Sequence, residues 1–205
     1  ALVIGRRVGD AADSVYEVEP GPGLATKLPL SDGQPVHAAY HPDPNRLLVT
    51  ADRGEGRLGV TLYDRSRQPW RALATVDDVA AAIPDAHNRR IVLAGMSQQN
   101  ILSTDLDLKH ARTIDRTNIR RRNRALAATR EGVRVMDSIP GCYWQWRLVA
   151  VEDSDRDARC LGGIGWHLEG VTVSPDGAML YMSVVEERQS DIGLAPLSAF
   201  ADASR

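Results

Sequence analysis

Short runs of β-forming residues alternate with turn residues along the whole chain. The clearest example is Val171–Leu197, in which the apolar runs Val171–Val173 and Met179–Val184 are separated by the turn sequence SPDG at 174–177. Proline holds φ near about −65° and glycine tolerates positive φ, so this tetrapeptide favours a tight turn. The stretch therefore predicts two strands that are joined as a β-hairpin.

Related turn sequences recur at a spacing of about 40–45 residues, and each is followed by an apolar run of strand length. A third strand that ends at an acidic or turn residue, and a short outer strand, recur at matching phase. Four short strands in a period of this length are typical of one blade of a β-propeller. The four turns lie at 41–46, 83–89, 129–132 and 174–177.

We predict an all-β fold: a β-propeller, or part of one, with four to five blades of four-stranded antiparallel sheets, as a single domain over residues 1–205. A β-sandwich also has many strands and turns, but it does not require the same turn at one period. Only the Ala-rich segment Val76–Ile83 and the tail Leu197–Ala203 have a helical pattern. In the propeller phase, Val79–Ile83 is an innermost strand, where small residues fit around the axis.

The repeat phase predicts three full blades and two partial ones. The chain begins at the second strand of one blade and stops after the third strand of another. An incomplete ring leaves sheet edges unpaired, whereas closed propellers avoid them. We expect either that 2–30 and 168–197 complete one another or that the chain is part of a longer polypeptide. The full blades are Gln34–Leu73, Asp77–Ile114 and Arg124–Leu161.

Composition and charge exclude several classes of protein. Hydrophobic residues make up 43% and charged residues 25% of the chain, and the formal net charge is −2. This near-neutral charge gives no general attraction to nucleic acid, and no apolar run reaches the roughly 20 residues that span a bilayer. We therefore expect no nucleic-acid partner and no insertion into a membrane. Cys142 and Cys160 lack metal-ligand spacing, and two buried thiols are favoured over a single disulfide.

The turn residues resemble those of a known repeat. The SPDG turn with its following strand, Asp191 and Ile192 at the next strand, and the Pro-Asp pairs at 42–43 and 84–85 resemble the repeat of the translocation protein TolB family and of related WD-like propellers. The copy at 130–132 has neither the proline nor the aspartate. The resemblance implies a binding platform within a larger bacterial protein, periplasmic or sensory, and it brings no catalytic residues. We expect a periplasmic location.

The candidate binding site lies on the loops between second and third strands, which share one face of a propeller. The richest of these loops is GCYWQ at 141–145. Tyr and Trp combine a large contact area with a polar group and are common in binding hot spots. The alternative is that Trp144 or Trp146 packs into the core. The residues predicted to bind another protein or protein segment are Tyr143, Trp144, Arg53, Gln98 and Arg188.

Other polar clusters are interpreted as solvated or isolated. The alternate carboxylates of Asp153–Asp157 lack the Gly and Glu that complete an EF-hand loop, so they indicate a turn. The basic run Arg116–Arg124 contains no aromatic residue, which favours a solvated loop over an anionic partner. His37, His167 and Glu169 lie near inner strands, but metal ligation needs at least three converging groups.

We therefore expect a binding or sensory module rather than an enzyme. The sequence offers no nucleophile with an adjacent base and no metal set, and it implies no catalytic residue and no cofactor. The class-level alternative is a propeller hydrolase or lactonase with a metal in its channel. Bound calcium or zinc near His37, His167 or Glu169 would favour that alternative.

A substitution tests the predicted site. Trp144→Ala is expected to weaken partner binding at least about tenfold and to leave the melting temperature nearly unchanged, because a hot-spot side chain contributes roughly 2 kcal/mol or more to binding. Titration of the partner and a thermal melt measure the two effects. A loss of several kcal/mol of stability would instead identify Trp144 as a core residue.

Overall fold

A computed structural model gives the structure of the chain. The structure describes residues 1–6, 8–19, 21, 23–30, 33–116, 126–129, 131–139, 141–149, 159–162, 167–174, 179–186 and 189–196. All regular elements in these residues are β-strands, and none of them is a helix that could cross a membrane.

The strands form five antiparallel sheets in chain order. The first sheet contains β1 (Leu2–Gly5), β2 (Ser14–Val18) and β3 (Ala25–Lys27). The second contains β4 (Gln34–Tyr40), β5 (Arg46–Asp52), β6 (Leu58–Asp64) and β7 (Arg71–Asp77). The third contains β8 (Val79–Asp85), β9 (Arg90–Gly95), β10 (Asn100–Thr104) and β11 (Arg112–Arg116). The fourth contains β12 (Leu126–Thr129), β13 (Gly132–Ile139), β14 (Cys142–Leu148) and β15 (Arg159–Gly162), and the fifth β16 (His167–Val173), β17 (Met179–Glu186) and β18 (Gln189–Pro196).

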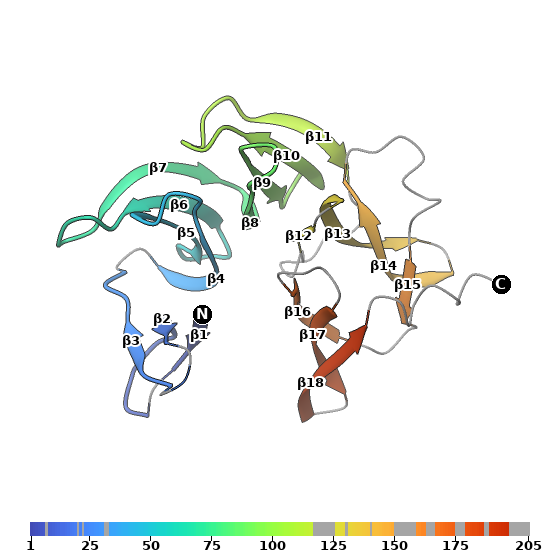
Figure 1. Cartoon of the computed structure of the whole chain (residues 1–205), viewed down its shortest axis with the longest axis horizontal. Helices are drawn as coiled ribbons and strands as arrows, with labels where there is room; N and C mark the ends of the chain where they lie inside the picture. The colour runs from blue at the N-terminus through green and yellow to red at the C-terminus, as the bar shows by residue number, and fades with distance from the viewer. Residues whose placement is uncertain are drawn as a thin grey trace.

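The five sheets follow one another around a common axis (Figure 1). Each sheet is a meander in which neighbouring strands pair in sequence order. The inner strands β4, β8, β12 and β16 lie next to one another around the axis. The prediction of an all-β propeller is therefore confirmed. Val79–Asp85 is an inner strand and not a helix, because its apolar side chains are buried on both faces between neighbouring sheets.

The first and last sheets each have three strands. Strand β4 contacts β1 and β2 in the way that β8 contacts β5 and β6, so β1 stands at the second-strand position. This agrees with the predicted phase of the repeat. The described strands of 2–30 and 168–197 form separate sheets, so they do not complete one blade.

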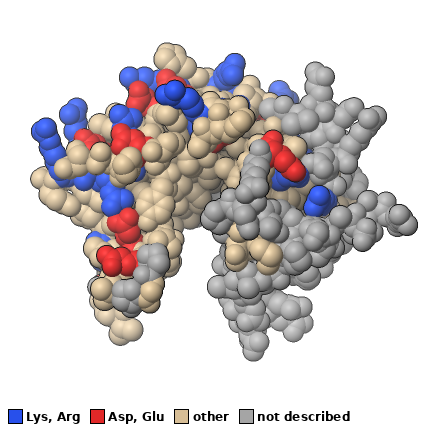
Figure 2. Space-filling model, in the orientation of Figure 1, with Lys and Arg blue, Asp and Glu red and all other residues tan. Residues whose placement is uncertain are grey.

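The core consists of apolar layers between adjacent sheets. Between the second and third sheets, the alternate residues Leu48, Val60 and Leu62 pack against Val79 and Leu93. Alternation directs every second side chain of a strand toward the same neighbouring sheet, which explains the pattern. Figure 2 shows Lys and Arg side chains along the outer edge of the ring, where β7 and β11 lie.

A buried ion pair joins the third and fourth sheets. Arg147 on β14 donates from Nε to Asp137 Oδ2 at 3.0 Å and from Nη1 to Asp115 Oδ2 at 2.8 Å. Asp137 lies beside it on β13, but Asp115 lies on β11 of the preceding sheet. Burial alone would lower the pKa of Arg147, yet the two carboxylates outweigh it and raise that pKa above its usual range.

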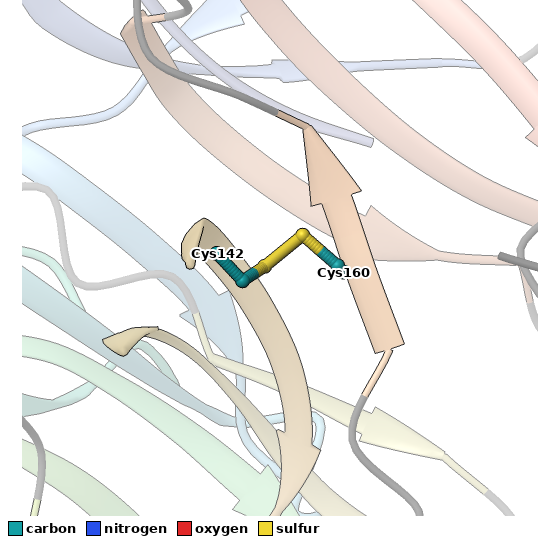
Figure 3. Close-up of a disulfide and its surroundings, with 2 residues drawn as sticks. All are labelled: Cys142 and Cys160. Atoms are coloured by element: carbon teal, nitrogen blue, oxygen red, sulfur yellow. A yellow bond between two sulfur atoms is a disulfide. The ribbon is translucent and has the colours of Figure 1, made fainter. Parts of the chain in front are cut away.

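The cysteines correct one expectation. Cys142 on β14 and Cys160 on β15 form a disulfide with a Cα–Cα distance of 5.7 Å, so the favoured interpretation as two buried thiols was wrong (Figure 3). Cys160 pairs with Gln145, three residues beyond Cys142, so the disulfide links the paired strands β14 and β15 near the start of β14. The disulfide encloses the segment between β14 and β15.

Removal of the buried arginine charge tests its structural role. Arg147→Ala is expected to lower the free energy of unfolding by about 3–5 kcal/mol, because it leaves two carboxylates without their counter-charge at a sheet interface. Urea denaturation measures the loss. Arg6→Ala, at an exposed ion pair, is the control and should change stability by under about 1 kcal/mol. A loss at Arg147 no larger than that of the control would contradict the assignment.

Candidate binding site

A cleft of about 790 Å³ lies between the second and third sheets. It opens at the end where the β5–β6 and β9–β10 loops and the linker from β7 to β8 meet. These loops come from two sheets that are sequential in the chain, so the meander brings them to one rim. The cleft is lined by Arg53, Gly56, Arg57, Leu58, Asp77, Asp78, Met96, Ser97 and Gln98.

The β5–β6 loop is a tight turn that presents Arg53 and Arg57. The backbone N–H of Arg53 donates to the carbonyl of Arg57 at 3.0 Å, which closes the turn. Asp52 accepts from the N–H of Gly54 at 2.9 Å. Gly54 adopts a φ of +101°, a conformation that favours glycine. The chemistry of these turn residues therefore fixes where the two arginines leave the backbone.

Arg53 is held on two sides. Its Nη1 donates to Asp77 Oδ1 at 2.8 Å and its Nη2 donates to Thr61 Oγ1 at 2.7 Å. A Cβ atom on Gly59 would lie 3.0 Å from Asp77 Oδ1 and 3.2 Å from the carbonyl of Val76, so glycine permits the close approach of this pair. The guanidinium is thus fixed at the rim before any ligand arrives.

Asp78 ties the linker to both loops. It adopts a φ of +60°, which Asp tolerates better than most residues. Its backbone N–H donates to the Leu58 carbonyl at 2.8 Å, and its own carbonyl accepts from the N–H of Met96 at 2.8 Å. Its carboxylate accepts from Ser97 Oγ at 2.5 Å and from the Ser97 N–H at 3.1 Å. The walls of the cleft are therefore cross-linked by short hydrogen bonds.

Gln98 stands on the opposite wall from Arg53. Its Oε1 accepts from Asn100 Nδ2 at 3.3 Å, and the rest of its side chain is exposed. Asn100 in turn requires glycine opposite it, since a Cβ on Gly95 would lie 1.9 Å from Asn100 Oδ1. The apolar floor comes from Leu58 and Met96. An apolar floor under a polar rim suits recognition of a peptide with an apolar anchor.

A smaller cleft of about 570 Å³ lies at the turns that carry the Pro-Asp pairs. Arg46 Nη1 donates to Asp107 Oδ1 at 2.6 Å across the second and third sheets. His41 is buried there with its Nε2 at 3.0 Å from the Leu106 carbonyl. Because these charges and ring atoms already pair with one another, this cleft presents fewer groups to a ligand than the first.

The structure places the predicted site residues unevenly. It brings Arg53 and Gln98 into the lining of one cleft. Tyr143 and Trp144 lie at the start of β14, next to the β13–β14 hairpin of the fourth sheet. Their side chains and the whole of Arg188 lie outside the described residues. Their role in binding stays a prediction.

Sequence reasoning did not single out the linker aspartates. Asp77 ends β7 and Asp78 links it to β8, at a position where an acidic turn residue is common and carries no special signal. Met96 and Ser97 belong to the β9–β10 loop, which is one of the loops between second and third strands that the sequence predicts to form the binding face. Trp146, the alternative core residue, is fully buried at 0% exposure.

His37 on β4 has an unusual environment. Burial lowers its pKa from 6.5 to about 4, so the ring is neutral at physiological pH. Within the described part of the chain, no three His, Cys, Asp or Glu residues gather in a metal-binding arrangement. The side chains of His167 and Glu169, the stretch Asp153–Asp157 and most of the run Arg116–Arg124 lie outside the described residues.

Comparison with known structures shows the fold. No protein-family model and no curated protein matches the sequence. TolB from Acinetobacter baumannii is similar over 97% of this chain and 50% of its own, with 12% identity and a TM-score of 0.69. The nidogen/laminin complex contains a chain that is similar over 91% of this chain and 69% of its own, with 14% identity and a TM-score of 0.61.

Hydrazine synthase from Kuenenia stuttgartiensis is similar over 91% of this chain and 57% of its own, with 14% identity and a TM-score of 0.58. The chain therefore spans half the length of the A. baumannii TolB chain that it matches. At such identities the likeness defines the class, a β-propeller protein, and not the activity.

The lowered pKa of the partly buried His37 predicts a pH dependence. Because the unfolded chain has an ordinary His pKa, it binds more protons than the folded chain between pH 6.5 and about 4, so stability falls as pH falls through this window. His37→Gln should flatten the decline, which urea denaturation at several pH values measures. His87→Gln, at an exposed turn, is the control. Equal slopes in His37→Gln and the unsubstituted protein would contradict the lowered pKa of His37.

Proposed function

We propose that this protein is a non-catalytic β-propeller that binds a segment of another protein in the cleft between the second and third sheets. The observation that carries the proposal is a preformed cleft with an apolar floor and a rim of fixed polar groups. Small-molecule and peptide sites commonly combine these two features. We further propose a TolB-like role in a larger bacterial assembly in the periplasm, which the fold of TolB supports.

The rigidity of the cleft supports recognition. Arg53 and Asp78 are held by hydrogen bonds of 2.5–3.1 Å to their own scaffold. Side chains that are fixed before binding lose little conformational entropy on binding. Arg57, by contrast, has a side chain that is 75% exposed, and its contacts are long: 3.5 Å from Nε to the Gly54 carbonyl and 4.0 Å from Nη2 to Glu55. It is therefore the cation best placed to contact a carboxylate of the partner.

The distribution of charge defines the partner further. Arg57 lines the cleft together with the apolar residues Leu58 and Met96. A segment with an acidic residue next to an apolar residue would satisfy both features. The backbone of such a segment would also form a hydrogen bond with the exposed side-chain amide of Gln98. Tyr143 and Trp144 belong to the same proposal as a further contact on the fourth sheet.

Selection from a phage-displayed peptide library tests the proposal. Peptides that bind the immobilised protein should carry an acidic residue beside an apolar one, and Arg57→Ala or Gln98→Ala should weaken them about tenfold or more. Arg89→Ala, an exposed arginine at the smaller cleft, is the matched control. Peptides that lose affinity only in the control variant would contradict the proposed site.

Metal analysis separates this function from the alternative. A propeller hydrolase or lactonase would hold a stoichiometric metal ion in its channel. Purified protein is expected to contain less than stoichiometric calcium or zinc. Stoichiometric metal that is lost in His37→Ala would favour the hydrolase and contradict the binding module.

A further inference from the structure

The second and third sheets present another surface at the end opposite to the first cleft. Because each sheet is a meander, the β4–β5, β6–β7, β8–β9 and β10–β11 loops all emerge at this end. The smaller cleft of about 570 Å³ is lined by three of these loops, which shows that the two sheets carry them to one face. We call this surface the turn face; it comprises residues 41–46, 64–71, 85–90 and 105–112.

Cations outnumber carboxylates on the turn face. Its four segments contain eight Arg or Lys residues and five Asp residues, so their formal net charge is +3 with His neutral, whereas that of the whole chain is −2. Glu17 of the first sheet, which accepts from Arg65 at 2.7 Å, offsets one of these charges. The turn face is therefore a positive region on a slightly negative protein.

The carboxylates of the turn face are engaged within their own turns. Asp105 accepts from the backbone N–H of Asp107 at 3.0 Å and from that of Lys109 at 2.7 Å. Asp43 and Asp64 each accept from the N–H two residues further along the chain, at 2.9 Å. Asp side chains commonly stabilise turns in this way. These bonds hold the negative charges against the backbone.

The remaining two carboxylates bind arginines of the same face. Arg90 Nε donates to Asp85 Oδ2 at 2.8 Å. Arg46 Nη1 donates to Asp107 Oδ1 at 2.6 Å, from the second sheet to the third. All five Asp residues of the turn face are thus engaged within the fold.

Half of the cations have no such partner. Their side chains are exposed, and none of them forms a hydrogen bond or an ion pair in the part of the chain that the structure describes. Two begin the outer strands β7 and β11, one precedes β11, and one lines the smaller cleft. Figure 2 shows Lys and Arg side chains along this outer edge. The four residues are Arg71, Arg112, Lys109 and Arg89.

We propose that the turn face binds an acidic segment of a partner protein, whose carboxylates pair with these four cations. Three of the four are arginines, and a guanidinium binds a carboxylate through two parallel hydrogen bonds. Arg46 and Arg90 already bind carboxylates on this face. The cations come from two adjacent sheets on either side of a cleft, which suits an extended segment that crosses from one sheet to the other. This surface is separate from the first cleft, so the proposal does not depend on the function proposed above.

Other anionic partners fit this surface less well. None of the loops at the turn face contributes an exposed large apolar side chain that could enter a membrane. Proteins that bind single-stranded nucleic acid stack bases on aromatic rings. The one aromatic ring of these segments outside histidine, that of Trp70, has the Arg65 guanidinium over it, 5.3 Å from the ring centre.

A fluorescent peptide of about eight glutamates is the probe, and anisotropy measures its affinity. It contains no apolar residue, so it does not satisfy the first cleft. Binding should be saturable and should weaken at least about tenfold between roughly 20 and 200 mM NaCl, because salt screens exposed charges. A glutamine peptide of the same length is the control and should not bind.

Paired substitutions locate the peptide. Arg71→Gln with Arg112→Gln removes one free cation from each sheet and should weaken binding about fivefold or more, because two charge-assisted hydrogen-bonded pairs are lost. Arg57→Gln with Arg116→Gln removes the same charge from the opposite end of the same sheets and should change affinity by less than about twofold. Arg71→Lys with Arg112→Lys keeps the charge and should retain most of the affinity. A thermal melt checks that each variant is folded.

Three results would overturn the proposal. The first is no saturable binding of the glutamate peptide to the unsubstituted protein. The second is a loss in the Arg57 and Arg116 pair that equals or exceeds the loss in the Arg71 and Arg112 pair, which would show attraction by overall charge or binding at the first cleft. The third is binding to vesicles that contain phosphatidylglycerol, lost in the Arg71 and Arg112 pair, without binding of the peptide, which would make a lipid surface the occupant.

Discussion

The packing of each sheet against the next, around a crowded axis, is the constraint on which the rest of this structure depends. Inner strands lie against one another there, so their side chains must be small, and Ala80, Ala81 and Ala82 are buried at that position. Where the sheets diverge outward, larger residues such as Leu62 and Leu93 fill the space between them. This geometry leaves the loops at the two ends of each sheet interface free to form clefts.

Polar interactions complete the interfaces that apolar packing begins. Arg147 joins the third sheet to the fourth, and Arg65 joins the second to the first by donating to Glu17 at 2.7 Å. The Arg65 guanidinium lowers the pKa of Glu17, so this pair stays charged at neutral pH. Such pairs are directional, whereas hydrophobic contact is not. They therefore restrict the rotation of one sheet relative to the next.

Much of the fold could be predicted because it repeats. The turn at 41–46 predicts a second turn at 83–89. The inner strand that is predicted to begin at Gln34 does begin there. The disulfide could not be predicted in this way. Cys142 and Cys160 are 18 residues apart in sequence, and only the folded arrangement of β14 and β15 shows that they meet. A contact between two particular side chains cannot be predicted from the period of the repeated turns and strands.

Part of the candidate site could also be predicted from the repeat. The phase of the repeat places Arg53 and Gln98 on corresponding loops, and the structure shows both in one cleft. The phase of the repeat does not indicate that Asp78 would adopt a positive φ and accept a hydrogen bond from Ser97, because many residue types occupy such linkers. The wall that these two residues form is therefore a finding of the structure alone.

Chemical-shift mapping with a library-selected peptide tests the central claim, that a partner segment binds between the second and third sheets. Binding there should give the largest amide shifts at Gly56, Met96 and Ser97, which line the cleft. Largest shifts at Asp43 and Asp107, at the opposite end of the same interface, would contradict it.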